Sequence, residues 1–321
     1  MATSFAERLS QGILIADGAM GTELYSRGGH GLHHSLDSLN ITNPNLVKAV
    51  HLDYISAGAE IITTNTYRAS APILTSQGVG EQFNTINSSA VRIAKEARRL
   101  SGQQVWIAGS IGPSVKQTDL FGAISLSNIS DTVQDQAEIL ANNGVDFILL
   151  ETFPSLLEIR EAISGVRKAT DLPIVAQLTF MEDKQTPGGD APLEVVSLLN
   201  ETDVLAYGAN CSVGPALLTE ILEAMVSKSN LPLIIQPNAG FGTYQNGRLV
   251  YGTSPEYMAE MASRMVEIGG AIIGGCCGTT PEHTAKIRDA VHVHEPKKAF
   301  RSKNSIVSTS TSKGNQKQIL E

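Results

Sequence analysis

The stretch ISDTVQDQAEILANNGVDFILLE, residues 129–151, contains the pattern that decides the fold. Its first part, residues 129–144, has apolar residues at helical spacing, begins with polar Ser and Asp and ends on a glycine, which predicts a helix. Its last part, FILLE at 147–151, is a short continuous apolar run. Such runs are typical of strands that are buried on both faces, as in a parallel sheet covered by helices. The stretch therefore predicts one helix and one strand of an α/β protein.

The same unit recurs along most of the chain. Further apolar runs predict strands at 13–17, 60–65, 105–110, 173–178, 204–210, 233–238 and 271–275, and helical patterns lie between them, for example at 43–58, 86–102 and 254–270. Parallel strands need crossover connections, and those crossovers cover the sheet. Eight units in about 290 residues predict a single-domain (β/α)8 TIM barrel. A doubly wound open sheet has the same local pattern and is the structural alternative.

The position of the polar residues favours the barrel. Polar and glycine-rich segments follow the strands all along the chain, as DGAMGTE (17–23), NTYRAS (65–70), GSIGPS (109–114), ETF (151–153), NCSVGP (210–215), PNAG (237–240) and GGCCGTT (274–280). In a TIM barrel the functional residues lie at the carboxyl ends of the strands, around the whole ring. The asymmetry therefore favours a closed barrel over an open sheet.

The composition limits the class of function. The 321 residues carry a formal net charge of −8, which argues against nucleic acid or anionic lipid as a partner. The N-terminal segment MATSFAERLSQ lacks the apolar stretch of a signal peptide, and no apolar run approaches the ~20 residues of a membrane span. We therefore expect a soluble, cytoplasmic protein that acts on small molecules.

The helical and strand patterns stop at about residue 294. Residues 295–321 are rich in Lys, Ser and Thr, and their large apolar residues are sparse. Segments of this composition cannot bury enough apolar surface to fold. We predict a barrel domain over residues 1–294 and a flexible tail or linker over residues 295–321.

The three cysteines lie where a barrel would bring them together. Cys211 follows the sixth predicted strand, and Cys276 and Cys277 follow the eighth. Three thiolates suit a zinc site that leaves a fourth position for substrate, whereas inert burial is the alternative for any single cysteine. Adjacent residues of a strand point to opposite faces, so both Cys276 and Cys277 can face one metal only if the backbone bends. The flanking glycines 274, 275 and 278 permit such a bend.

Six segments, in order along the chain, resemble the homocysteine S-methyltransferase family: DGAMGTELY (17–25), TTNTY (63–67), ETF (151–153), GANCSVGP (208–215), PNAG (237–240) and GGCCGTTPEH (274–283). The resemblance runs from about residue 12 to about residue 290. The family comprises zinc-dependent barrel enzymes that methylate the thiol of homocysteine. The resemblance implies that Cys211, Cys276 and Cys277 bind zinc. It also implies that Asp17, the Gly18-Ala19-Met20 backbone and Glu151 hold the amino-acid part of homocysteine.

The residue types at the predicted rim agree with these roles. Asp17 can accept from an ammonium group, although a Gly-rich turn after a strand is also common for structural reasons alone. Glu151 closes an apolar strand, where a carboxylate is costly unless it is paired or faces the barrel mouth. Ser110 can add a hydrogen bond to the substrate or cap the next segment. Asn238 is a candidate for the fourth zinc position before the substrate arrives.

The residues that would indicate the identity of the methyl donor are harder to align with the family. In the betaine-dependent branch of the family a tyrosine near the second strand is tied to the metal. Tyr67 and Arg68 can each align with that tyrosine, which argues mildly against betaine. The leading hypothesis is therefore zinc-dependent methyl transfer to L-homocysteine, giving L-methionine, from S-methylmethionine or a related sulfonium.

Three other interpretations of the sequence stay open. The chain can be the homocysteine module of a cobalamin- and methylfolate-dependent methionine synthase or of a fusion with methylenetetrahydrofolate reductase, and then needs a donor-domain partner. A homo-oligomer is also compatible with the sequence. A noncatalytic protein that binds zinc and homocysteine is the alternative from another class. A zinc-free aldolase or lyase barrel would want a lysine at a strand end, and no predicted strand ends in one.

Overall fold

The computed structural model describes residues 3–28, 35–114, 126–245 and 248–291. Eight parallel strands form one sheet in the order β1-β10-β7-β6-β5-β4-β3-β2, and a bridge between Ala16 and Ile61 joins the first strand to the last. The amide of Asp17 donates to the carbonyl of Ile61 at 3.0 Å across this seam. The sheet is therefore closed. The prediction of a TIM barrel is confirmed, and the open sheet is excluded.

All eight predicted strands are present. They are β1 (Leu14–Ile15), β2 (Ile61–Thr63), β3 (Trp106–Ile111), β4 (Phe147–Phe153), β5 (Ile174–Leu178), β6 (Ala206–Asn210), β7 (Leu233–Gln236) and β10 (Gly270–Ile273). Several end earlier than predicted. The seventh stops at Gln236 because Pro237 has no amide hydrogen to donate to a neighbouring strand.

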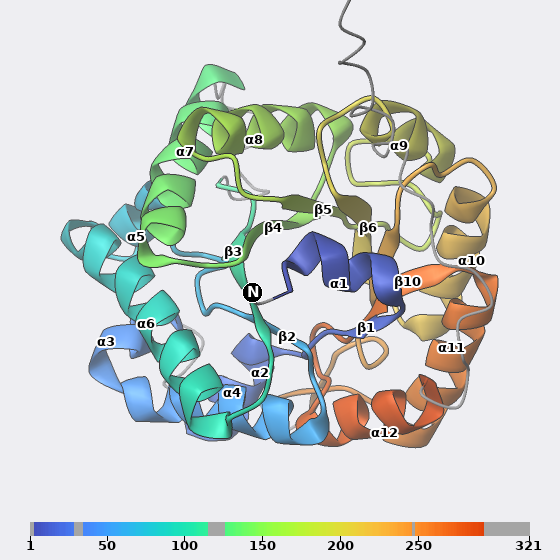
Figure 1. Cartoon of the computed structure of the whole chain (residues 1–321), viewed down its shortest axis with the longest axis horizontal. Helices are drawn as coiled ribbons and strands as arrows, with labels where there is room; N and C mark the ends of the chain where they lie inside the picture. The colour runs from blue at the N-terminus through green and yellow to red at the C-terminus, as the bar shows by residue number, and fades with distance from the viewer. Residues whose placement is uncertain (1–2, 29–34, 115–125, 246–247, 292–321) are drawn as a thin grey trace, which may run out of the picture.

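Helices surround the strands and cover the outside of the barrel (Figure 1). The helices are α1 (Phe5–Gln11), α2 (Met20–Ser26), α3 (Leu39–Thr42), α4 (Pro44–Ala57), α5 (Ala71–Ser76), α6 (Phe83–Ser101), α7 (Leu126–Asn143), α8 (Leu156–Ala169), α9 (Pro192–Leu199), α10 (Pro215–Val226), α11 (Pro255–Ile268) and α12 (Pro281–Val291), with a short 3₁₀ turn at Gly80–Gln82. The four helical patterns quoted above match α4, α6, α7 and α11. In α4, for example, the side chain of Asn43 caps the first turn and Gly58, in the left-handed conformation, ends the last.

The apolar side chains of the strands face two different layers. One set packs against the helices outside the barrel, and the other fills its interior, with Trp106, Phe147 and Ile234 among the latter. Helix α1 lies across the amino-terminal opening of the barrel (Figure 1), and the ring of Phe5 stacks on that of Phe147 with centroids 4.0 Å apart. The interior is thus closed by α1, which leaves the carboxyl-terminal opening for the site.

Two of the elements that the sequence patterns did not predict bear on the barrel and its site. Helix α1 is one, although Ser4 and Glu7 form a capping box that signals its start. The other is the antiparallel hairpin of β8 (Thr243–Gln245) and β9 (Arg248–Val250), which follows β7. None of the helices within the described residues combines the length and the apolar character that crossing a membrane requires.

Residues 292–321 lie outside the described residues, so the domain boundary stays a prediction. Helix α12 ends at Val291, and with it the eighth strand and its covering helix are complete. We therefore expect truncation after Val293 to leave the melting temperature, the metal content and the homocysteine affinity unchanged. Differential scanning calorimetry and metal analysis of the truncated chain test this. A large fall in melting temperature would place the boundary further along the chain.

Candidate active site

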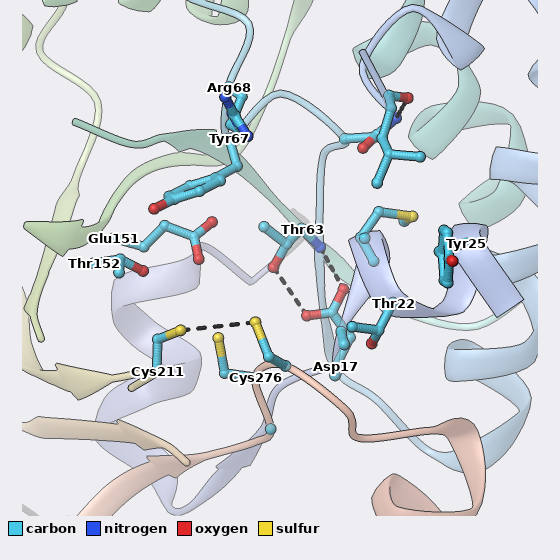
Figure 2. A pocket seen from close by; sticks show the side chains of 18 of the residues that line it. Asp17, Thr22, Tyr25, Thr63, Tyr67, Arg68, Glu151, Thr152, Cys211 and Cys276 are labelled. Atoms are coloured by element: carbon cyan, nitrogen blue, oxygen red, sulfur yellow. Dashed lines mark hydrogen bonds between the residues drawn. The ribbon is translucent and has the colours of Figure 1, made fainter. Parts of the chain in front are cut away.

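A cavity of about 720 Å³ lies at the carboxyl ends of the strands. Figure 2 shows its wall with the three kinds of side chain that carry the chemistry: thiols, carboxylates and phenols. Its lining comes from the carboxyl ends of β2, β4, β6 and β7, from the segments that follow β1, β2, β6 and β10, and from the end of β9 with the residue after it. The structure thus has a cavity where the sequence predicts the site.

The three cysteines converge on one side of this cavity. Their sulfur atoms all lie within 4.8 Å of one another, and those of Cys211 and Cys277 are 3.7 Å apart. Zinc–sulfur bonds of about 2.3 Å at tetrahedral angles place two sulfurs about 3.8 Å apart. The cluster is therefore able to hold a metal ion, and its dimensions fit zinc. The prediction that the fold brings these cysteines together is confirmed.

Backbone geometry turns both adjacent cysteines toward the cavity. The chain after β10 reverses at Gly278, whose φ of 81° is in the left-handed region, and a Cβ there would lie 2.1 Å from Cγ of Tyr251. The loop is held by the amide of Cys276, which donates to the carbonyl of Pro237 at 2.8 Å. Cys211 also has a positive φ, of 64°. Non-glycine residues in this region carry strain, and such strain collects at functional sites.

Two polar side chains contact the cysteine sulfurs. The amide nitrogen of Asn210 lies 3.7 Å from the sulfur of Cys276, and the hydroxyl of Tyr251 donates to the sulfur of Cys277. Hydrogen bonds from Cys211, from Cys276 and then from Tyr251 lower the pKa of Cys277. The cluster therefore already favours one thiolate, which is the form that binds a metal.

Asp17 lies beside the cysteine cluster, two residues after the end of β1. Its two carboxylate oxygens accept from the amide of Thr63 at 2.7 Å and from the hydroxyl of Thr63 at 2.9 Å (Figure 2). Burial raises the pKa of Asp17 to about 7, against the lowering effect of these bonds, and the nearby Glu151 raises it further. A carboxylate so placed gains from a cationic ligand.

Glu151 lies at an irregularity in β4. The pairing with β5 shifts between Leu150 and Phe153, and Thr152 has a φ of 63°, which is unusual for a β-branched residue. The hydroxyl of Ser110 donates to one carboxylate oxygen of Glu151, and the amide of Asn210 reaches the other at 3.4 Å. Burial raises the pKa of Glu151 to about 7. The irregularity thus presents a second desolvated carboxylate to the cavity.

The turn after Asp17 contributes backbone to the cavity wall. Gly18, Ala19 and Met20 all line it. The amide of Ala19 is already used, because it donates to the hydroxyl of Thr279 at 3.1 Å. A Cβ at Gly18 would lie 2.5 Å from the same hydroxyl oxygen, so the glycine lets this turn approach the cysteine loop. Helix α2 begins at Met20, and the amides of a first turn have no acceptor within their own helix.

Two predicted site residues do not line the cavity. Ser110 is buried behind Glu151, so its contact with the substrate would be indirect, through the bond to that carboxylate. Asn238 is buried next to the cysteine loop, and its side-chain oxygen accepts no hydrogen bond from the described residues. A fourth ligand from Asn238 stays a prediction.

Tyr67, one of the two residues that can align with the tyrosine of the betaine-dependent branch, lines the cavity. Figure 2 shows the ring of Tyr67 between Arg68 and the cysteines. A Cβ at Gly112 would lie 2.4 Å from Cε2 of Tyr67, so the absence of a side chain at Gly112 lets the ring pack against the backbone. Burial raises the pKa of the Tyr67 phenol, which is therefore a neutral group.

Asn210 and Tyr251 are functional candidates that the sequence analysis did not identify. Asn210 belongs to the polar segment after the sixth predicted strand, and its side chain bonds to Thr152, Glu151 and Cys276. Its place directly before Cys211 was the available signal. Tyr251 reaches the cluster because of the hairpin, which had no signal in the apolar pattern.

The charges of the cavity wall are mostly negative. Asp17, Asp37 and Glu151 line it together with the three cysteines, and Arg68 is the cationic side chain in the lining of the described chain. Among the described residues, neither Arg68 nor any of these three carboxylates takes part in an ion pair. Buried charges are normally paired, so the wall is built for ligands that carry positive charge.

Known proteins are similar to this chain in sequence and in fold. The sequence profile of the homocysteine S-methyltransferase family matches residues 14–291. The chain is similar to the homocysteine methyltransferase MmuM from Escherichia coli in its metallated form, with 28% identity, a TM-score of 0.73, and coverage of 87% of this chain and 96% of MmuM. A methyltransferase from Methanosarcina mazei, 14% identical with a TM-score of 0.56 over 89% of this chain and 96% of the other, shares the fold.

Longer proteins are also similar. A methionine synthase from Mycobacterium tuberculosis is 28% identical over 96% of this chain and 27% of its own length, and one from Mycobacterium leprae is 28% identical over 90% and 25%. The chain thus spans about a quarter of the length of these relatives. The profile, by contrast, covers the whole described barrel from β1 to α12. The chain therefore belongs to the homocysteine S-methyltransferase family.

Proposed function

We propose that this protein transfers a methyl group to the thiol of L-homocysteine, giving L-methionine, with a zinc ion held by Cys211, Cys276 and Cys277. The observation that carries the proposal is the convergence of these three sulfurs, within 4.8 Å, on a cavity that the carboxylates of Asp17 and Glu151 also line. Three protein ligands are typical of a zinc site that keeps one position for a substrate. A zinc ion in such a site supplies a thiolate from a substrate thiol at neutral pH.

The chain's own residues bind and orient the amino acid. Asp17 and Glu151 would accept hydrogen bonds from the homocysteine ammonium, whose charge offsets the desolvation that raises both of their pKa values. Thr63 holds Asp17, and Ser110 and Asn210 hold Glu151. The turn at Gly18-Ala19-Met20 would bound the substrate on the side of α2. Transfer then depends mainly on bringing the sulfur into line with the methyl group.

The charge of the cavity supports a cationic methyl donor. A sulfonium such as S-methylmethionine carries its positive charge on the atom that releases the methyl group. The carboxylates of Asp17, Asp37 and Glu151 attract that charge, whereas they disfavour a donor with several carboxylates, such as a methylfolate. We therefore propose S-methylmethionine or a related sulfonium as the donor.

A second candidate function rests on the longer relatives. Because two methionine synthases contain a region similar to the whole of this barrel, the chain can serve as the homocysteine module of such an enzyme. Its methyl group would then come from a corrinoid on a partner domain. A noncatalytic protein that binds zinc and homocysteine would use the same residues without turnover.

One assay separates these candidates. Purified zinc-loaded protein is incubated with homocysteine and, in turn, S-methylmethionine, S-adenosylmethionine, betaine and methylcobalamin, and methionine is measured. We expect S-methylmethionine to be used at least about tenfold better, by kcat/KM, than betaine, a difference of about 1.4 kcal/mol. The variant Cys277→Ala serves as the inactive control. Methionine formed only with methylcobalamin would identify a module, and homocysteine binding without turnover on any donor would identify a binding protein.

A further inference from the structure

His283 is a buried histidine to which the proposed chemistry gives no role. It lies in the first turn of α12 and ends the motif GGCCGTTPEH (274–283), which also carries the cysteine loop, residues 276–280. The side chain is 6% exposed, yet both ring nitrogens have partners. Nδ1 lies 3.2 Å from the amide nitrogen of Thr280, and Nε2 lies 3.0 Å from the carbonyl oxygen of Thr253. The imidazole therefore joins two segments that are distant in the sequence.

The two partners decide which ring nitrogen carries the proton. A backbone amide only donates, so Nδ1 accepts from Thr280, and a carbonyl only accepts, so Nε2 carries the proton and donates to Thr253. Thr280 directly precedes α12, and His283 is the third residue of that helix. A side chain there that accepts from the amide before the helix forms half of a capping box, a role that Glu or Gln usually fills. A glutamate could cap α12 but could not donate to Thr253, so the bond to Thr253 is a role beyond capping.

Two backbone hydrogen bonds continue from Thr253 to the cysteine loop. The amide of Thr253 donates to the carbonyl of Ala239 at 3.0 Å, and the amide of Ala239 donates to the carbonyl of Cys277 at 2.9 Å. Together with the two bonds of His283 they form a closed circuit that leaves the cysteine loop at Thr280 and returns to it at Cys277. All four bonds run in the same direction, and hydrogen bonds in such a chain strengthen one another. His283 thus closes a circuit that fixes the loop of the proposed metal ligands.

The same circuit holds the segment that carries Tyr251. The hairpin before Tyr251 gives it little support, because β8 is exposed and Val250 is 40% exposed. On the side toward α11, by contrast, the chain is tied to the barrel at Thr253. Between these points the Tyr251 ring packs on Gly278, where a Cβ would lie 2.1 Å from its Cγ, and its hydroxyl donates to the sulfur of Cys277. The position of Tyr251 against the cysteine loop therefore depends on the bond from His283 to Thr253.

We propose that His283 is a positioning residue for the metal site: through Thr253 it holds Tyr251 against the cysteine loop. This inference rests on the zinc site of the proposed function and is independent of the methyl donor. Groups that orient metal ligands from outside the coordination shell typically contribute about 10- to 100-fold to metal affinity. Tyr251 is such a group for Cys277, and His283 acts one step further out, through Tyr251.

Zinc affinities of single and double variants test this route. His283→Asn keeps an acceptor for the amide of Thr280 and lacks the donor to Thr253, so the helix cap stays and the link is lost. We expect it to raise the dissociation constant of zinc in the full-length protein by about 10- to 100-fold, and Tyr251→Ala to act similarly. All three thiols remain in both variants, so both still bind zinc. Because His283 acts through Tyr251, the double variant should bind zinc no more weakly than Tyr251→Ala alone. Competition with a chromophoric chelator of known zinc affinity measures all four proteins without methyl transfer.

A matched control accounts for a general loss of stability. Glu7 is the third residue of α1, at the opposite opening of the barrel, and accepts from the amide of Ser4 at 2.7 Å. Glu7→Ala removes this capping bond and should leave the dissociation constant of zinc unchanged.

A measurement on the wild type needs no variant and no metal. Nitrogen-15 NMR of the His283 ring should show the proton on Nε2 and an unprotonated Nδ1 that accepts a hydrogen bond.

The outcomes separate this inference from the proposed function. The inference is overturned if His283→Asn binds zinc as tightly as wild type, if its effect adds to that of Tyr251→Ala, or if the ring proton lies on Nδ1. Each of these results leaves the proposed methyl transfer intact. A protein that shows the coupled zinc affinities but forms no methionine with any donor supports the inference and refutes the methyl transfer. A wild type that binds no zinc contradicts both.

Discussion

Replacing Cys276 or Cys277 by alanine is expected to remove the zinc ion and with it the methyl transfer. Each change leaves two thiolates, and two ligands cannot complete a site of the kind that three sulfurs within 4.8 Å would form. Zinc content should fall from about one ion per chain to a small fraction of that value after dialysis against a weak chelator. Methionine formation should fall below detection. Plasma emission analysis and the methionine assay measure the two effects.

A matched variant separates loss of a ligand from general damage near the cluster. Tyr251→Phe removes the hydroxyl that donates to Cys277 and keeps all three thiols, so we expect it to retain zinc. The melting temperatures of the alanine variants should be compared with that of metal-stripped wild type, because metal binding contributes to folding stability. Full zinc occupancy in both alanine variants would refute the metal site.

The barrel could be predicted because each strand carries its own local signal. The continuous apolar runs at 147–151 and 173–178 correspond to β4 and β5, whose residues face either the interior or the helices and so are apolar on both sides. Once eight such strands close into a ring, their carboxyl ends lie at one opening. The convergence of Cys211 with Cys276 and Cys277 followed from that topology, without knowledge of any side-chain position.

The parts that could not be predicted depend on contacts between distant segments. The hairpin of β8 and β9 consists of short strands, and β8 is exposed, so no apolar pattern marks it. Because the hairpin could not be predicted, the contact of Tyr251 with Cys277 could not be predicted either.

Two expectations drawn from the residues themselves became specific only with the contacts in the structure. Glycines 274, 275 and 278 were expected to permit a bend, and of these Gly278 adopts the left-handed conformation. At Gly274 a Cβ would lie 2.8 Å from the Cβ of Ala16, so this glycine serves the close approach of β10 to β1. Ser110, expected to touch the substrate or to cap a segment, instead donates to Glu151. The sequence thus indicated which segments lie near one another, whereas the role of each residue depended on its contacts in the folded chain.

Glu151 offers the sharpest test of how the amino acid is held. Glu151→Gln keeps the size of the side chain and its ability to accept from Ser110, but it removes the charge that would pair with the homocysteine ammonium. We expect the dissociation constant of homocysteine to rise by about 10- to 100-fold, which corresponds to the roughly 1.5–3 kcal/mol of a charge-assisted hydrogen bond. Zinc content should not change, because Glu151 is not one of the proposed ligands. Glu138→Gln, the same change at an exposed residue of α7, is the control for calorimetric binding.

The stability of the same variant distinguishes binding from structure. Burial raises the pKa of Glu151 from its ordinary value of 4.5 to about 7. A carboxyl group whose pKa is higher in the folded than in the unfolded protein loses folding free energy as the pH rises from 4.5 through 7, and the full loss applies above pH 7. A neutral glutamine does not incur this loss, so at pH 8 the melting temperature of ligand-free Glu151→Gln should equal or exceed that of wild type. A residue retained for structure would behave in the opposite way: Glu151→Gln would then lower the melting temperature and leave homocysteine affinity unchanged. Weaker binding in a protein that is no less stable is the result expected of a carboxylate that is kept for its ligand.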